Sequence, residues 1–187
     1  MKLTARLRAA FPAAFVHFLL SCTVAALAAA LVWGIWFPYP YAELSGGREL
    51  FLLLVSVDIV CGPLLTLVVF ERSKPRSELV RDLTVISLLQ VAALVFGLHT
   101  VYEARPLYLV HEVDRYRVVT WADYQGVDVS KDIESLDASL QPTAFSGPRL
   151  VGTRNAKDMI EYAEVLSQSM AGGRDISQRP NFYVAYD

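Results

Sequence analysis

The sequence predicts a membrane α-helical protein with three transmembrane helices, followed by a small C-terminal α+β domain outside the cytoplasm. Apolar residues make up 54% of its 187 residues and charged residues 19%, against about 45–50% and about 25% in an average soluble domain. Charges are absent from Ala9 to Ala42 and from Leu83 to Tyr102, and only Asp58 interrupts the segment from Leu50 to Phe70. Because a helix of about 20 apolar residues crosses the hydrocarbon core, each segment is long enough to span a membrane.

The expected spans cover residues 11–37, 50–70 and 83–102. The first ends in aromatic residues whose amphipathic rings suit the headgroup layer, and Pro38 and Pro40 then stop the helix. We therefore expect a membrane domain over residues 1–103 and an α+β domain over residues 104–187.

Lysine and arginine residues predict the orientation, because they favour the cytoplasmic side of a membrane. They gather before the first span and between the second and third, at Lys2, Arg6, Arg8, Arg72, Lys74, Arg76 and Arg81. The opposite side carries fewer close to the membrane, namely Arg48, Arg105, Arg115 and Arg117. We expect a bacterial inner-membrane protein with a cytoplasmic N-terminus and a periplasmic C-terminal domain. A cleaved signal peptide is disfavoured because the apolar run continues to Phe37, well beyond the about 7–15 residues of a signal sequence.

The C-terminal domain shows a succession of short elements. The pattern predicts a hairpin over 107–120, a short helix near 130–140, a strand at 149–152 and a last strand over 181–186. Asn155 is the expected N-cap of a further helix, which Gly172 and Gly173 end. Its apolar residues recur at helical spacing, at Met159, Ile160, Ala163, Leu166 and Met170.

Composition and motifs argue against catalysis, cofactors, metals and nucleic acid. The sequence has no phosphate loop, no nucleophile elbow and no metal-ligand cluster. Both cysteines fall inside spans and the three histidines are scattered. The net charge of −2 offers no general attraction for phosphates.

Asp58 is the most informative residue of the spans. A carboxylate near mid-membrane costs about 2.5–3.5 kcal/mol for insertion, so we expect its side chain to face protein rather than lipid. Gly62 and Thr66 follow at i+4 and i+8 and therefore lie on the same face of the helix. Small and polar residues on one stripe are typical of contacts between membrane helices.

The other spans offer partners for this stripe. Gln90 is expected within about 6 Å of the depth of Asp58. His17 and Ser21 form a second polar pair at i and i+4. Two interpretations stay open: the polar residues lock the bundle together, or they bind a partner helix. A proton path is a weaker third, since a relay of further acids is missing.

Several segments together resemble a known family. Tyr39-Pro-Tyr-Ala-Glu-Leu-Ser-Gly-Gly-Arg-Glu-Leu50 leads into the second span, and Val57-Asp-Ile-Val-Cys-Gly-Pro-Leu-Leu-Thr66 lies within it. Glu112-Val-Asp-Arg-Tyr-Arg117, Gly147-Pro-Arg-Leu150 and Arg179-Pro-Asn-Phe-Tyr183 follow. This set resembles the TfpX/TfpZ family of type IV pilin accessory proteins over nearly the whole chain. The family-motif residues of the loop before the second span are Tyr39, Tyr41, Ser45, Gly46, Gly47 and Arg48.

The resemblance implies a non-catalytic inner-membrane protein of fimbrial biogenesis. Such proteins support pilin stability, pilus assembly or pilus dynamics, as a chaperone would. The implied partners are the type IV major pilin, other inner-membrane pilus-assembly proteins and the lipid bilayer. An alternative is a membrane sensor or regulatory subunit with a periplasmic ligand-binding domain, which the short cytoplasmic loop disfavours. A membrane enzyme would need a nucleophile, a base and an orienting group together, and the spans supply only one acid.

Overall fold

The computed structural model describes residues 2–186, with side chains from residue 6 onward, so the side chain of Lys2 lies outside the described residues. The chain forms two compact units. The helical unit comprises Met1–Val32 and Arg48–Val101, and the C-terminal unit comprises Trp33–Gly47 and Tyr102–Asp187.

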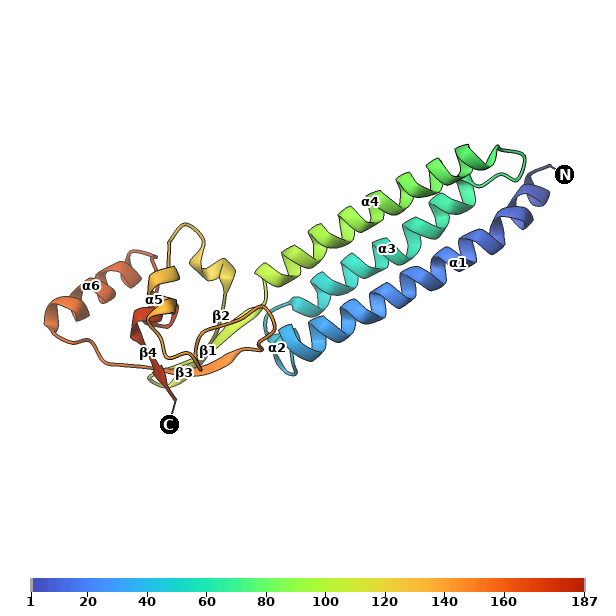
Figure 1. Cartoon of the computed structure of the whole chain (residues 1–187). Helices are drawn as coiled ribbons and strands as arrows, with labels where there is room; N and C mark the ends of the chain where they lie inside the picture. The colour runs from blue at the N-terminus through green and yellow to red at the C-terminus, as the bar shows by residue number, and fades with distance from the viewer. Residues whose placement is uncertain (1, 187) are drawn as a thin grey trace. The chain divides into compact units, whose positions relative to one another are not determined.

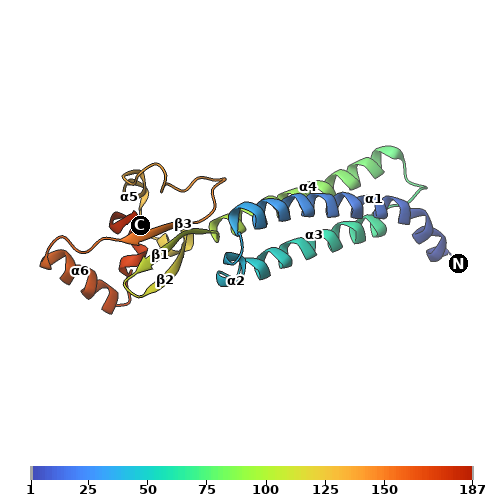
Figure 2. The same cartoon turned by 90° about the horizontal axis from the view of Figure 1, so that it is seen from below.

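Within the described residues, three helices are long and apolar enough to cross a membrane, which confirms the predicted fold class. They are α1 (Lys2–Leu31), α3 (Gly47–Val69) and α4 (Arg76–Glu103), and they run side by side (Figures 1 and 2). α1 and α4 begin several residues before the apolar runs do. The early residues include Arg6, Arg8, Arg76 and Arg81, and arginine is both a good helix former and able to extend its charge toward water.

The outer surface of the helical unit is apolar. Large side chains such as Leu64, Leu88 and Phe96 are more than half exposed, as expected of residues that face lipid. Its buried residues are mostly small, and those of α1 are Ala10, Ala14, Ser21, Ala25 and Ala28. Small residues allow close helix approach, which is how membrane helices pack in the absence of a hydrophobic driving force.

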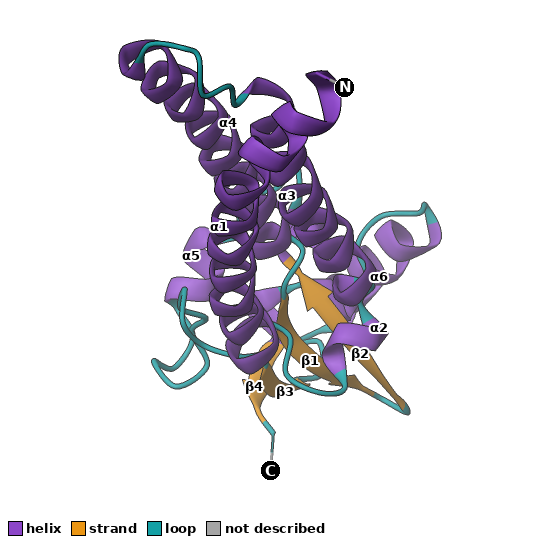
Figure 3. Ribbon diagram, turned by 90° about the vertical axis from the view of Figure 1, so that its right-hand side faces the viewer, coloured by secondary structure: helices purple, strands orange, loops and turns teal. Residues whose placement is uncertain are grey.

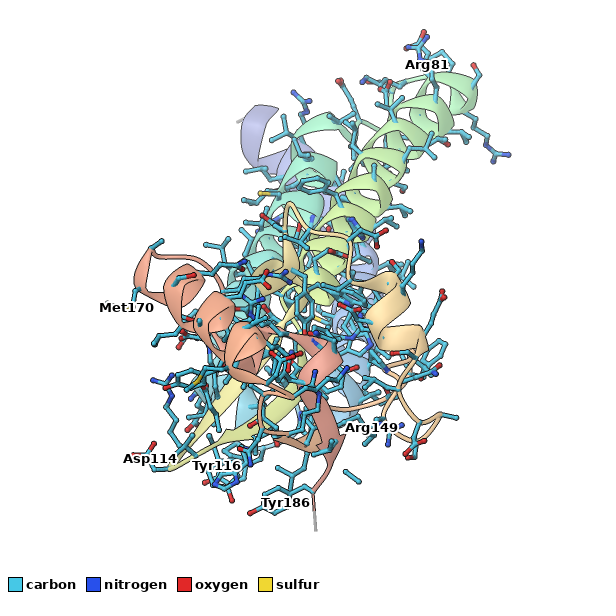
Figure 4. All side chains as sticks on the ribbon, turned by 90° about the vertical axis from the view of Figure 1, so that its left-hand side faces the viewer. Arg81, Asp114, Tyr116, Arg149, Met170 and Tyr186 are labelled. Atoms are coloured by element: carbon cyan, nitrogen blue, oxygen red, sulfur yellow. The ribbon has the colours of Figure 1, made fainter. Side chains whose placement is uncertain are left out.

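A four-stranded mixed sheet forms the centre of the C-terminal unit, in the order β2-β1-β3-β4 (Figure 3). The strands are β1 (Pro106–Glu112), β2 (Arg115–Thr120), β3 (Arg149–Thr153) and β4 (Tyr183–Ala185). β1 pairs antiparallel with β2 and parallel with β3, while β3 pairs antiparallel with β4. The predicted hairpin over 107–120 is confirmed. The ring of His111 contacts the rings of Tyr116 and Tyr186. The hydroxyls of the two tyrosines, which are labelled in Figure 4, form a hydrogen bond of 2.8 Å.

Short helices and turns cover the core of this unit. They are η2 (Trp121–Tyr124), α5 (Ser130–Glu134), η3 (Ile176–Gln178) and η4 (Pro180–Phe182). The core consists of Leu107, Tyr108, Val110, Val119, Tyr124, Val129, Ile133, Val151 and Tyr183. The helix predicted near 130–140 is present but shorter than expected, since only residues 130–134 are helical.

The helix α6 (Met159–Met170) begins later than predicted. Asp158, not Asn155, is the N-cap, because its carboxylate accepts hydrogen bonds from the backbone N–H groups of Ile160 and Glu161. The apolar stripe points away from the sheet: Met159 and Met170 are 79% and 81% exposed, and Met170 projects outward at the end of the helix (Figure 4).

The loop after α1 belongs to the C-terminal unit from Trp33 onward. It contains the π-helical turn η1 (Val32–Trp36) and the short helix α2 (Tyr41–Leu44). The Trp36 indole donates to the backbone oxygen of Ala144 at 2.8 Å and meets the ring of Tyr102 edge-on. Arg105, 1% exposed, lies over the same Tyr102 ring and donates to the backbone oxygen of Thr143. Together these contacts hold Trp36 and Tyr102 within the C-terminal unit.

Candidate functional site

A cavity of about 630 Å³ lies among the three long helices of the helical unit. Residues of α1 and α4 form its walls, while Asp58 and Thr66 of α3 contribute to its floor. Val16, Leu20 and Val91, which line it, are each more than half exposed, so the cavity is an open groove. Its polar lining consists of His17, Ser21, Asp58, Thr66, Ser87 and Gln90.

Asp58 and Gln90 meet within this groove. The Gln90 Nε2 atom donates to the backbone oxygen of Asp58 at 3.2 Å and to its carboxylate Oδ1 at 3.4 Å. The contact expected from their depths is therefore present. The Gln90 Oε1 atom is buried and has no hydrogen-bond partner among the described residues.

Gly62 makes this contact possible. A Cβ atom at position 62 would overlap the side-chain amide of Gln90. The absence of a side chain thus lets Gln90 reach across α3 to Asp58, one helical turn earlier in the chain. The spacing from Asp58 to Gly62 predicted that both residues lie on one helix face. The structure explains why position 62 is glycine, because a larger residue would displace the Gln90 side chain.

His17 and Thr66 form a second polar pair. The His17 Nδ1 atom and the Thr66 Oγ1 atom lie 2.6 Å apart, and Thr66 is 1% exposed. His17 thus pairs with α3, although the sequence pattern had grouped it with Ser21 of its own helix. A spacing of four residues shows which side chains share a helix face, whereas the partner on another helix depends on how the helices pack.

Polar groups extend along the groove between these two pairs. Asp58 and Thr66 are eight residues apart on α3, which corresponds to about 12 Å along a helix. Ser21 follows His17 by one turn on α1, and Ser87 precedes Gln90 by nearly one turn on α4; both line the groove. Ser87 was not among the predicted site residues, although its spacing of three residues from Gln90 placed it on the same helix face.

A second, smaller cavity of about 280 Å³ lies between α3 and α4. Its lining is apolar apart from Asp58 and Thr100. Gly97 borders it, and a Cβ atom there would overlap the side chain of Leu54. Asp58 therefore borders two cavities of different character, one with several polar groups and one nearly without.

The family-motif loop residues do not join the groove, because five of the six belong to the C-terminal unit. Tyr39 is 86% exposed. Tyr41 begins α2, and burial raises the pKa of its hydroxyl above the ordinary value. The Ser45 hydroxyl donates to the backbone oxygen of Tyr41 at 2.7 Å, and Gly46 has a positive φ of 70° that ends this short helix.

The last two motif residues open the second span. Gly47 is buried against the ring of Phe37, where a Cβ atom would overlap the ring. Arg48 is exposed in the first turn of α3. The loop residues thus shape the turn between the first two spans. Among the described side chains, no group of three or more His, Cys, Asp or Glu residues could hold a metal ion.

Comparison with known proteins identifies relatives of this chain. Residues 5–46, which cover most of α1 and the motif loop up to Gly46, match the family model described as fimbrial assembly protein FimB. A fimbrial assembly protein of Dichelobacter nodosus, serogroup I, is 34% identical over 171 residues, which are 91% of this chain and 65% of that relative. The protein of serogroups C1 and C2 is 40% identical over 108 residues, which are 58% of this chain and 82% of the relative. This chain therefore spans less than two thirds of the serogroup I relative. No solved structure matches it.

Proposed function

Because the chain belongs to the fimbrial assembly protein family, we propose that it is an accessory protein of the TfpX/TfpZ type that binds the major pilin of type IV pili. In this proposal it lies in the inner membrane with its N-terminus in the cytoplasm and its C-terminal unit in the periplasm. It holds pilin before assembly, as a membrane chaperone, and performs no catalysis.

The observation that carries this proposal is the open groove with its row of polar groups in an otherwise apolar bundle. A pilin waiting in the membrane has an apolar N-terminal helix that carries a buried glutamate. Such a helix needs protein around its polar group, because lipid cannot satisfy hydrogen bonds. A groove that offers Asp58, Gln90 and His17 at the surface of a lipid-embedded bundle supplies that protection.

The C-terminal unit supports the same function from outside the membrane. α6 turns Met159, Ile160, Leu166 and Met170 away from its own sheet. Methionine-rich stripes adapt to partners of different shape because the side chain is flexible. We propose that this stripe contacts the globular head of pilin while the groove shelters the pilin helix.

A clean deletion in the native bacterium tests this function. Surface pili are counted and total pilin is measured by immunoblotting, with the gene restored in trans as the control. We expect fewer pili, a lower pilin level or both, and recovery on complementation. Normal pili together with a normal pilin level would reject the proposed function. Pulldown of the full chain from solubilised membranes should recover the major pilin.

A further inference from the structure

One end of the polar row in the groove, at Asp58 and Gln90, holds hydrogen-bond acceptors that lack matching donors. Gln90 Nε2 directs its hydrogens to two oxygens of Asp58, while Gln90 Oε1 is buried without a partner in the described part of the chain. The only hydrogen bond to the Asp58 carboxylate within that part is the one of 3.4 Å. A carboxylate offers about four acceptor sites, so this point can accept more hydrogen bonds than it receives.

The other end of the groove can both donate and accept. His17 uses Nδ1 toward Thr66, and the other ring nitrogen has no partner among described residues. In a neutral imidazole one nitrogen donates and the other accepts. The two ends lie about 12 Å apart along α3, or about two turns of helix.

We propose that the groove binds a transmembrane helix with two polar residues about two turns apart, one of which donates a hydrogen bond to Asp58 and Gln90. The second polar residue faces His17. Suitable donors are a hydroxyl, a side-chain amide, an amine or a protonated carboxyl group. This inference rests on the proposed function and specifies the chemistry of the pilin helix that the groove selects.

Other occupants satisfy the groove less well. A lipid acyl chain has no donors and would leave Gln90 Oε1 unpaired, at the usual cost of an unsatisfied buried polar group. A second copy of this chain offers few donors on its outer faces: the hydroxyls of Thr23, Ser56 and Thr100 already donate to carbonyls of their own helices. The groove is long enough for about three turns of a helix, since the α1 wall from Pro12 to Val24 runs for about 18 Å.

Photo-crosslinking in living cells tests the proposal with the full chain. A photoreactive residue is placed at Val91, which lines the groove, or at Leu88, which is exposed on the same helix and lines neither cavity. We expect the pilin to crosslink at Val91 and not at Leu88. Adducts of lipid alone, or of a second copy of this chain, would overturn the proposal.

Two glycine variants test the polar recognition in the Val91 background. Gly62→Ala displaces the Gln90 amide, whereas Gly97→Ala affects only an apolar neighbour in the second cavity. Loss of one hydrogen bond predicts about a 2- to 12-fold weaker pilin crosslink for Gly62→Ala, and little change for Gly97→Ala. Equal crosslinking in both variants would overturn the proposed donor contact while leaving pilin binding intact.

A leucine scan of the polar residues in the pilin helix tests the spacing. Two sensitive positions, seven or eight residues apart, are expected from about 1.5 Å of rise per residue. Sensitivity at one position, or at none, would overturn the two-point recognition. Pilin that copurifies but crosslinks at neither Val91 nor Leu88 would also overturn it, because binding would then lie elsewhere. Absence of any association between the two proteins would instead reject the proposed function.

Discussion

The two polar atoms of the Gln90 side-chain amide have different hydrogen-bonding roles: Nε2 donates to Asp58, and Oε1 has no described partner. The Nε2 atom thus ties α4 to α3, and the Oε1 atom is left buried. Locking the bundle and binding a guest helix are therefore compatible roles for one residue. The donor atom fixes how α3 and α4 meet, while the acceptor atom stays available to a third helix.

A single and a double variant together separate these two roles. Gln90→Leu leaves the Asp58 carboxylate without its described hydrogen bond, so we expect a loss of about 1–3 kcal/mol in the free energy of unfolding. Adding Asp58→Leu removes the unpaired group as well and should restore most of that stability, because replacing both partners is nearly neutral. Unfolding of the full chain in mixed micelles with increasing SDS measures both effects.

The same double variant should fold but fail to retain pilin. In this variant the groove lacks the side-chain acceptors of Asp58 and Gln90, while leucine residues keep an apolar contact between α3 and α4. Pulldown of pilin with the Asp58→Leu/Gln90→Leu chain, compared with wild type at equal membrane levels, measures this. Retained pilin in a stable double variant would assign the pair to bundle locking alone.

Thr66 provides a second prediction, at the other end of the groove. Thr66→Val keeps the shape of the side chain but removes the hydroxyl that meets His17 Nδ1 at 2.6 Å. We expect a loss of about 0.5–1.5 kcal/mol, the usual worth of one hydrogen bond, measured by the same unfolding experiment.

Ser87→Ala is the matched control for Thr66→Val. Ser87 lines the same groove, but its hydroxyl has no hydrogen bond among the residues that the structure describes. Its removal should change stability by less than about 0.5 kcal/mol. Equal losses for both variants would show that the His17–Thr66 contact contributes nothing specific.

Hydropathy predicted the three membrane-spanning helices well, because the length and charge of a continuous segment decide whether it can cross the bilayer. Both properties can be read directly along the sequence. The Asp58–Gln90 contact followed from depth by the same reasoning. The pairing of His17 with Thr66 did not, since it depends on the rotation of α1 about its axis. The exposure of the apolar stripe of α6 could not be predicted either, because helical periodicity identifies an apolar face but does not show whether the rest of the fold covers it.

The buried tyrosines of the C-terminal unit give a third prediction. The hydroxyls of Tyr124 and Tyr183 lie 2.9 Å apart, and Tyr183 also donates to the backbone oxygen of Ser177 at 2.6 Å. Burial raises the pKa of both hydroxyls, so both stay neutral at ordinary pH. Tyr183 is thus the centre of the chain of hydrogen bonds and Tyr124 its end.

Tyr183→Phe should therefore destabilise the unit more than Tyr124→Phe. The first change leaves two buried groups without a partner, at about 1–3 kcal/mol each. The second leaves Tyr183 with its bond to Ser177 and should cost about 0.5–1.5 kcal/mol. Thermal unfolding of the full chain, followed by near-ultraviolet circular dichroism, gives the order. The reverse order would contradict the hydrogen-bond chain.

Glu161 gives the last prediction, which concerns pH. Arg154 holds its carboxylate through two hydrogen bonds of 2.9 Å, and the backbone N–H of Lys157 adds a third. Arg154 first, and then Lys157, lower the pKa of Glu161 from 4.5 to about 2. A lowered folded-state pKa means that this contribution to stability is complete above the ordinary value of 4.5 and is lost as the pH falls toward 2.

The loss should be local to α6, because the helix has no buried residue and the Arg154–Glu161 contact ties its first turn to the segment after β3. Hydrogen exchange of α6 amides, normalised to intrinsic rates, should show falling protection between about pH 4.5 and 2. Glu161→Gln should show that low protection already at neutral pH. Glu164→Gln lies on the same helix, and the Glu164 carboxylate accepts a side-chain hydrogen bond from Gln168 but none from Arg154 or Lys157 among the described residues, so this variant should behave as wild type. Unchanged protection in Glu161→Gln would mean that α6 is held by contacts other than Arg154–Glu161.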